Sequence, residues 1–325
     1  MKLSLKNIGK LNDSQIEING LTIIAGDNNT GKSTVNKALY AAFKSLNNYK
    51  EKIYYNRLNK LKKSILGIVR RSLRRGSLRR ESIRSNYSMR SFLTFRNNIN
   101  SLLENFMSDE VQDSNKLVDE IFEFFNSDNL EIEKKQIVEI IEEILNVSDY
   151  DIFKNLSSGN FEAEFNGQIS NLYESNKKSL IQLEISKTKT SFEFYDNSIS
   201  EINEPIDLEV FPIYIDGQSR FEDESESLLL GINHNNHNID FNKMLNNKKY
   251  NVDEIDWVLN NKKLNKLIGN IKRVVPGEMI QDESDGYFYI ENNKRININN
   301  VSSGLKSFIY IKELILKGFI KKMDY

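Results

Sequence analysis

The residues best suited to do chemistry run from Gly26 to Ser33, in the order Gly-Asp-Asn-Asn-Thr-Gly-Lys-Ser. This is G-x-x-x-x-G-K-S without a mismatch, the pattern of a phosphate-binding loop. Gly26 and Gly31 allow backbone angles that a Cβ would forbid, so the loop amides can turn inward around a phosphate. Lys32 supplies a cation for the β- and γ-phosphates of a nucleotide, and the Ser33 hydroxyl is a ligand for Mg²⁺. The pattern therefore predicts binding of Mg²⁺ and ATP.

The sequence on both sides of this loop predicts the elements that hold it. Residues 21–25, Leu-Thr-Ile-Ile-Ala, are short and apolar, which predicts a buried parallel strand. Residues 1–18 alternate around a turn and predict a hairpin that leads into that strand. Apolar residues at helical spacing follow the loop and predict a helix: Val35, Ala38, Leu39 and Ala42. The predicted nucleotide ligands on the loop and the start of the helix are Gly26, Asn28, Asn29, Thr30, Gly31, Lys32, Ser33 and Thr34.

Bulk composition narrows the class of protein. The 325 residues are more than one ordinary core holds, so two lobes or a core with an insertion are expected. The formal net charge of −1 argues against a globally basic nucleic-acid binder. The absence of cysteine excludes disulfides and thiolate metal sites. The N-terminus lacks the apolar core of a secretory signal, and no run approaches the roughly 18 apolar residues that span a bilayer, so we expect a cytoplasmic protein without a membrane partner.

Residues 49–157 differ in character from the N-terminal segment. Apolar residues recur at spacings of three and four with almost no glycine or proline, which predicts an α-helical insertion. The segment 70–96 is rich in arginine, and acidic residues follow it. These arginines are either contacts for the phosphate backbone of DNA or RNA, or a solvated helix face paired with the acidic helices.

A period of two begins near residue 160. Residues 160–167, 180–187, 191–197 and 208–218 are predicted as strands. The last of them ends at Gln218, which is either placed to reach Mg²⁺ or the attacking water, or is a simple turn residue.

Two further segments complete the reading of the chain. Residues 219–272 look helical, and within them His234 and His237 are predicted to lie in a polar, asparagine-rich loop because no third metal ligand is near. Residues 278–299 predict an antiparallel meander with turns at Asp285-Gly286 and Asn292-Asn293.

The meander leads into the segment Val301-Ser302-Ser303-Gly304-Leu305, which opens the last helix. Ser302 and Ser303 are suited to cap that helix, and its free amides can face an anion. The side of this helix expected to face the core carries Phe308, Ile309, Ile311 and Leu314.

The order of these features resembles ABC-type ATPases of the SMC-like and overcoming-lysogenization-defect branch, often described in bacteria as AAA family ATPases. Residues 301–305 stand where that family has its signature loop, although Leu305 departs from the glutamine of transporters. The resemblance implies that Ser302, Ser303 and Gly304 act in trans, on the γ-phosphate held by a second copy. It implies a homodimer that closes around ATP, and a partner effector such as a nuclease or toxin in DNA repair or anti-phage defence.

The resemblance also implies an α/β fold: a P-loop ABC-type ATPase core with an antiparallel β subdomain and a large α-helical insertion. The expected segments are an ATPase lobe at 1–48, the insertion at 49–157, the β-rich part of the lobe at 158–218 and a signature subdomain at 219–325. Lys32 and Gln218 would be catalytic, and Ser33 and Gln218 would bind Mg²⁺.

In that family an acidic Walker B strand follows the signature helix. The expectation is that this strand lies beyond the chain, as in a truncated protein, a split subunit or an incomplete chain. Turnover would then be weak unless a second polypeptide supplies the missing acids. Two other functions stay open: an ATP-regulated nucleic-acid-binding protein that uses segment 70–96, and a catalytically inactive scaffold.

Overall fold

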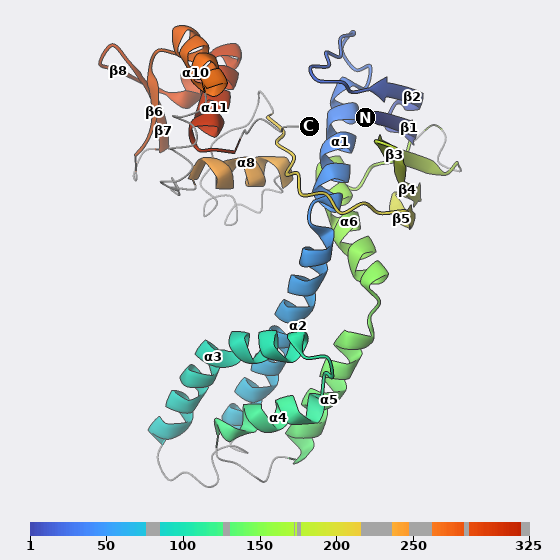
Figure 1. Ribbon diagram of the computed structural model, residues 1–325, viewed down its shortest axis with the longest axis vertical. Helices are drawn as coiled ribbons and strands as arrows, with labels where there is room; N and C mark the ends of the chain where they lie inside the picture. The colour runs from blue at the N-terminus through green and yellow to red at the C-terminus, as the bar shows by residue number, and fades with distance from the viewer. Residues whose placement is uncertain are drawn as a thin grey trace. The chain divides into compact units, whose positions relative to one another are not determined.

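The computed structural model describes residues 1–75, 85–125, 131–171, 173, 177–215, 236–246, 262–282 and 286–319. The chain divides into two compact units, shown in Figure 1. The first unit comprises Met1–Lys44, Ser158–Pro205 and Phe211–Tyr325, and the second comprises Ser45–Ser157 and Ile206–Val210. The four segments expected from the sequence, with boundaries after residues 48, 157 and 218, stay predictions.

A five-stranded antiparallel sheet forms one layer of the first unit. Its strand order is β2-β1-β3-β4-β5. The strands are β1 (Lys2–Ile8), β2 (Leu11–Glu17), β3 (Ser179–Ile185), β4 (Thr188–Tyr195) and β5 (Ser198–Asn203). The alternating N-terminal residues form the predicted hairpin, in which Leu3 pairs with Ile16. Leu3, Leu5 and Ile8 are fully buried, so the apolar residues of β1 form part of the core.

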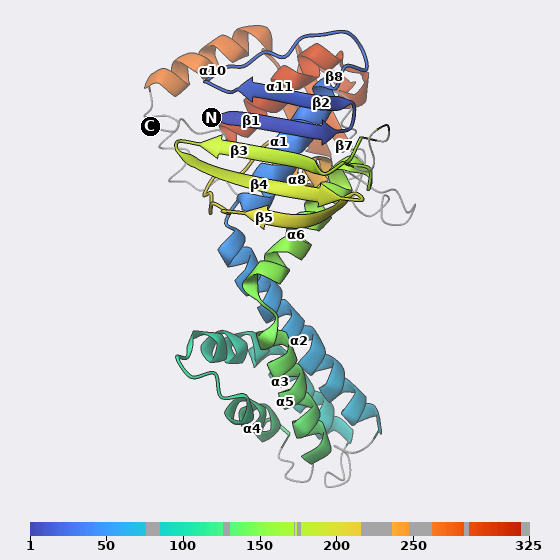
Figure 2. The same cartoon turned by 90° about the vertical axis from the view of Figure 1, so that its right-hand side faces the viewer.

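Helices cover one face of this sheet. Helix α1 (Lys32–Leu46) crosses behind the strands in Figure 2, and α6 (Asp149–Phe165) packs its Phe161 ring 5.0 Å from the rings of Phe192 and Phe194. The predicted strand at 160–167 is therefore wrong, because residues 160–165 are the end of α6. Phe161, Glu164 and Phe165 are the buried positions there, at the i, i+3, i+4 spacing of a helix.

The second unit confirms the prediction of a helical region. Its elements, besides the start of α6, are α2 (Tyr49–Arg75), α3 (Ser85–Ser108), α4 (Ser114–Glu123) and α5 (Glu131–Asn146). Buried aliphatic and aromatic residues from all four helices form one core, which includes Ile65, Phe95, Ile121 and Ile137. Asp113 caps α4 by accepting hydrogen bonds from the backbone N–H groups of Asn115 (2.9 Å) and Lys116 (3.2 Å).

The long strand predicted at 208–218 is not formed. Leu208 makes one isolated bridge, in which its N–H donates to Leu46 O (3.0 Å) and its carbonyl accepts from Asn48 N (2.9 Å). Residues 209–215 are irregular, and Asp216, Gly217 and Gln218 lie outside the described residues. Residues 209–215 alternate in polarity as a strand would, but no described strand pairs with them, and a strand needs such a neighbour.

The C-terminal elements of the first unit include a second antiparallel sheet. The elements are α8 (Asn236–Asn246), α10 (Lys262–Val274), β6 (Glu278–Asp282), β7 (Gly286–Glu291), β8 (Lys294–Asn297), the short 3₁₀ helix η3 (Ile298–Asn300) and α11 (Ser303–Leu316). Strands β6, β7 and β8 form the predicted meander. Asn292 and Asn293 have φ of 49° and 62°, the left-handed pair that a two-residue hairpin turn requires.

Helix α11 buries one side against this sheet and α8. Ile309 and Leu314 are buried as predicted, Ile311 is half-buried, and Phe308 is 46% exposed, so the prediction that Phe308 faces the core is wrong. The neighbouring Tyr310 fills the core position instead, with its ring 5.0 Å from that of Phe241 in α8. Lys312 is also buried and donates to Val275 O (3.2 Å) and Gly277 O (2.6 Å), which ties α11 to the segment before β6.

No helix in the described ranges is long and apolar enough to cross a membrane.

Candidate nucleotide-binding site

The loop between β2 and α1 has the positive φ predicted at Gly31, whereas Gly26 does not have a positive φ. Asn29 (φ 66°) and Gly31 (φ 98°) both have the positive φ that asparagine and glycine tolerate better than other residues. The Thr30 hydroxyl donates to Asp27 O at 2.9 Å. Lys32 Nζ donates to Gly26 O at 2.7 Å and to Asp27 O at 2.5 Å. The ammonium group therefore lies inside the curl of the loop, where a phosphate would meet it.

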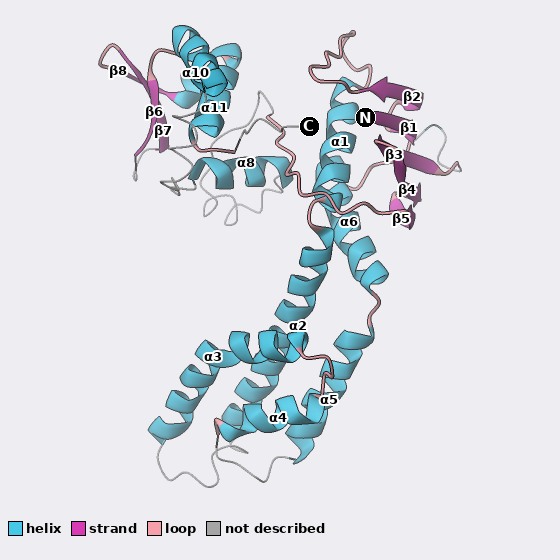
Figure 3. Ribbon diagram, viewed as in Figure 1, coloured by secondary structure: helices cyan, strands magenta, loops and turns pink. Residues whose placement is uncertain are grey.

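The strand predicted before this loop is absent. Residues 21–25 are loop in Figure 3, and Leu21 and Ile23 are 88% and 81% exposed. An apolar run becomes a buried strand only where neighbouring strands supply hydrogen bonds and cover both faces. In the part of the chain that the structure describes, no strand pairs with residues 21–25. The prediction of a buried parallel strand at 21–25 is therefore wrong for this structure.

The turn between β1 and β2 holds the loop in place instead. A Cβ built on Gly31 would lie 2.7 Å from Leu11 Cδ2, and one built on Gly9 would lie 3.2 Å from Thr34 Cγ2. Both spaces are tighter than ordinary van der Waals contact, so only glycine fits without a shift. The hairpin thus contacts Gly31, just before the first residue of α1, and Thr34, in the first turn of that helix.

The first turn of α1 presents unbonded amides. The first hydrogen bond into this helix is donated by Val35 N to Gly31 O at 3.1 Å, so the amides of Lys32, Ser33 and Thr34 precede it. Free amides and the positive end of the helix dipole favour an anion here. The Ser33 side chain is exposed, and its hydroxyl makes no hydrogen bond to any described residue. This hydroxyl fits the role of a Mg²⁺ ligand; the other predicted ligand, Gln218, lies outside the described residues.

Comparison with protein families matches residues 1–86 to a family described as an AAA domain. The chain carries an AAA domain at its N-terminus. The match contains β1, β2, the phosphate-binding loop and α1, which are the elements of the candidate site. An AAA domain supports ATP binding and makes ATPase activity a candidate function. Neither the curated proteins nor the solved structures include a match to this chain.

The second group of predicted ligands lies at the start of α11, outside the AAA domain match. Ser302 occupies the N-cap position, but its side chain makes no capping hydrogen bond, and Ser303 is the first helical residue. The expectation that these serines cap the helix is therefore wrong. Ser302, Ser303 and Gly304 are exposed, and the first helix bond is donated by Lys306 N to Ser302 O at 2.9 Å. Among the described residues no hydrogen bond joins this group to the loop at 26–33.

A buried polar cluster at the far end of α1 was not predicted from the sequence. Tyr40 Oη and Lys44 Nζ donate to Asp240 Oδ2 of α8 at 2.5 and 2.6 Å. Burial, and next the hydrogen bond to Asp240, raise the pKa of the Tyr40 phenol. These bonds fix α8 against the helix that begins at the phosphate-binding loop.

His237 belongs to the same cluster. It lies buried in α8 rather than in a polar loop, so that prediction is wrong; His234 lies outside the described residues. Its Nδ1 lies 2.6 Å from Glu164 Oε2, and its backbone N donates to Glu164 Oε1 at 2.9 Å. The described residues contain no group of three or more His, Asp or Glu side chains that could hold a metal ion. Glu164 lies 73 residues away in sequence, so no local signal could have found the pair.

Proposed function

We propose that this protein is an ATP-binding ATPase of the ABC and SMC-like type, and that ATP makes two copies of it dimerise. The observation that carries the proposal is the loop at 26–33, where Lys32 Nζ lies on the loop carbonyls directly before the free amides of α1. A triphosphate offers charged oxygens in place of those two neutral carbonyls, and charge-assisted hydrogen bonds are about twice as strong as neutral ones. Mg²⁺ would be held by Ser33 together with the phosphates.

The exposed start of α11 supports the dimerisation half of the proposal. Ser302, Ser303 and Gly304 present unbonded amides on the surface, which is what contact with a phosphate held by another copy requires. The resemblance to SMC-like ATPases supports an ATP sandwich in which each copy contributes one loop and one such helix start. It also supports a role in DNA repair or anti-phage defence beside an effector protein such as a nuclease or toxin.

Two variants test the proposal. Lys32→Ala should abolish ATP binding measured by titration calorimetry, because the loop loses its only lysine. Ser302→Arg should leave binding to the monomer intact and block ATP-dependent dimerisation measured by light scattering. Ser198→Arg, at the exposed start of strand β5, is the matched control for adding a cation to the surface. Normal dimerisation of Ser302→Arg with ATP would refute the role of α11.

Nucleic-acid binding is a second candidate function. Arg70 and Arg71 of α2 and Arg96 of α3 are exposed, and α2 packs against α3 in the second unit. Arginines on neighbouring helices are suited to contact successive phosphates. Binding of double-stranded DNA that falls steeply with salt, and is lost when these three arginines become glutamate, would favour this function.

A further inference from the structure

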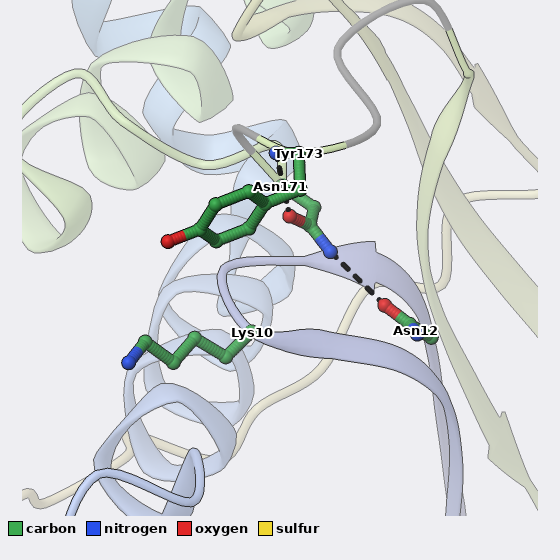
Figure 4. A pocket seen from close by; sticks show the side chains of 4 residues that line it. All are labelled: Lys10, Asn12, Asn171 and Tyr173. Carbon is green, nitrogen blue, oxygen red and sulfur yellow. Dashed lines mark hydrogen bonds between the residues drawn. The ribbon is translucent and has the colours of Figure 1, made fainter.

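A hollow in the first unit is lined by Lys10, Asn12, Asn171 and Tyr173 and has a volume of about 400 Å³. Figure 4 shows the Tyr173 ring and the Lys10 side chain extending to the same side of it. Lys10 and Asn12 belong to the turn between β1 and β2 and to the start of β2. Asn171 and Tyr173 belong to the segment between α6 and β3. No motif in the sequence marks these four residues as a site.

The hollow adjoins the phosphate-binding loop. Lys10 lies between Gly9 and Leu11, and these two neighbours are the residues that touch Thr34 and Gly31 at the start of α1. The turn between β1 and β2 and the start of α1 lie at the same end of the sheet in Figure 2. Asn171 is held to this turn region by the hydrogen bonds that it donates to Asn7 O and Asn12 Oδ1. A ligand with phosphates on the loop would therefore have its other end close to the hollow.

Hydrogen bonds fix the wall that carries Tyr173. Asn171 is 3% exposed; its backbone N donates to Asn7 O (3.1 Å) and its Nδ2 donates to Asn12 Oδ1 (3.0 Å). Its Oδ1 accepts from Tyr173 N at 3.0 Å. The backbone of Tyr173 is thereby held to β2, while its ring is 88% exposed. An aromatic ring held at its backbone and open on its face is suited to stack with another aromatic group.

The polar groups of the hollow narrow the ligand class. Within the described ranges, Lys10 has no ionic partner, and the residues known to line the hollow include no carboxylate. Its walls thus offer a cation and amide groups beside a stacking surface. A nucleotide presents a flat base to stack and negatively charged phosphates, which matches this combination.

Resting on the proposed function, we propose that the hollow takes the nucleoside end of the triphosphate, with a purine base stacked on Tyr173 and Lys10 beside the ribose and phosphates. Stacking recognises the face of the base rather than its edge. The site therefore accepts ATP and GTP with affinities within a few-fold of each other. Pyrimidine nucleotides, with a smaller face, bind more weakly.

The test compares ATP with inorganic tripolyphosphate, both with Mg²⁺, by calorimetry on the full chain. The wild type should bind ATP about tenfold tighter than tripolyphosphate, as expected for an exposed stacking contact. Tyr173→Ala should remove this difference and leave tripolyphosphate binding unchanged, whereas Tyr173→Phe should retain it. Tyr195→Ala is the matched control, because Tyr195 is also exposed, at 62%, but does not line the hollow.

The possible results separate this inference from the proposed function. Wild-type protein that binds tripolyphosphate and ATP equally, with no effect of Tyr173→Ala on either, overturns the nucleoside site and leaves the phosphate-binding loop standing. Wild-type protein that binds neither ligand overturns the proposed function and the nucleoside site with it. A loss of ATP affinity in Tyr173→Phe as large as in Tyr173→Ala overturns stacking as the cause.

Discussion

Replacing Glu164 tests how α8 is held to α6 within the first unit. Glu164, in the last turn of α6, is fully buried, and His237 of α8 is 1% exposed. One carboxylate oxygen lies 2.6 Å from His237 Nδ1, and the other accepts from His237 N at 2.9 Å. Glu164→Ala removes both acceptors and leaves two buried donors without a partner.

The size of the effect follows from these two contacts. Hydrogen bonds to a charged group contribute about 1.5–3 kcal/mol each, and breaking a buried pair by removing one partner costs about 3–5 kcal/mol. We therefore expect Glu164→Ala to lower the local opening free energy of α8 by about 3–5 kcal/mol. Glu164→Gln should cost only about 1 kcal/mol, because its amide oxygen can accept from His237 N and its amide nitrogen can donate to Nδ1 in the other ring tautomer.

Amide hydrogen exchange of the full chain measures this opening directly. Since 1.4 kcal/mol is a factor of ten, the amides of α8 should lose at least a hundredfold of their protection in Glu164→Ala and about fivefold in Glu164→Gln. Glu162→Ala is the matched control, because Glu162 lies in the same helix and is exposed. Unchanged protection of α8 in Glu164→Ala would refute the conclusion that this pair holds α8 in place.

Three further predictions concern the loop, α11 and pH. Gly31→Ala should weaken ATP binding at least tenfold in calorimetry, because the left-handed φ and the collision with Leu11 together cost about 2–4 kcal/mol. Adding Leu11→Ala should restore only part of the ATP affinity. Full restoration of the affinity would show that φ does not matter. Lys312→Met should lower the free energy of unfolding by about 1–3 kcal/mol in urea, because two buried carbonyls lose their donor; an unchanged midpoint would contradict this. Burial raises the pKa of Tyr287 to about 12, so its contribution to stability is constant below the unfolded pKa of about 10 and is lost as pH rises toward 12. In urea unfolding from pH 8 to 11.5, the free energy of unfolding should therefore fall more steeply for the wild type than for Tyr287→Phe. Equal slopes would contradict the assignment.

Local signals in the sequence predicted the elements whose geometry is decided locally. The N-terminal hairpin follows from apolar alternation around Gly9, and α1 follows from Val35, Ala38 and Ala42, all of which are buried. The turn at Asn292-Asn293 follows from the tolerance of asparagine for the left-handed region. The loop at 26–33 belongs to this class, because its glycines and lysine act through their own backbone and side chain.

Three of the wrong predictions share one physical cause: they depended on a partner distant in sequence. The run 21–25 is apolar enough for a buried strand, but the described residues provide no strand beside it. Apolar and polar residues alternate over so short a run at 160–165 that both a strand and a helix fit the pattern. The packing of Phe161 against β4 favours the helix. His237 lies between asparagines in the sequence, yet it is buried in the fold, where its ring contacts Glu164.

Helix α8 connects the two groups of predicted nucleotide ligands within the first unit, although it carries no ligand itself. At one side, Asp240 accepts hydrogen bonds from Tyr40 and Lys44 of α1, the helix that begins at the phosphate-binding loop. At the other side, Phe241 packs its ring against Tyr310 of α11, the helix that begins at Ser303. Adjacent residues of one helix thus contact both helices, through a charged pair and through a fully buried aromatic contact. These two contacts therefore tie α1 and α11 to the same helix. The buried pair of Glu164 and His237 adds a contact from α6 to this helix, so three helices of the first unit meet at α8.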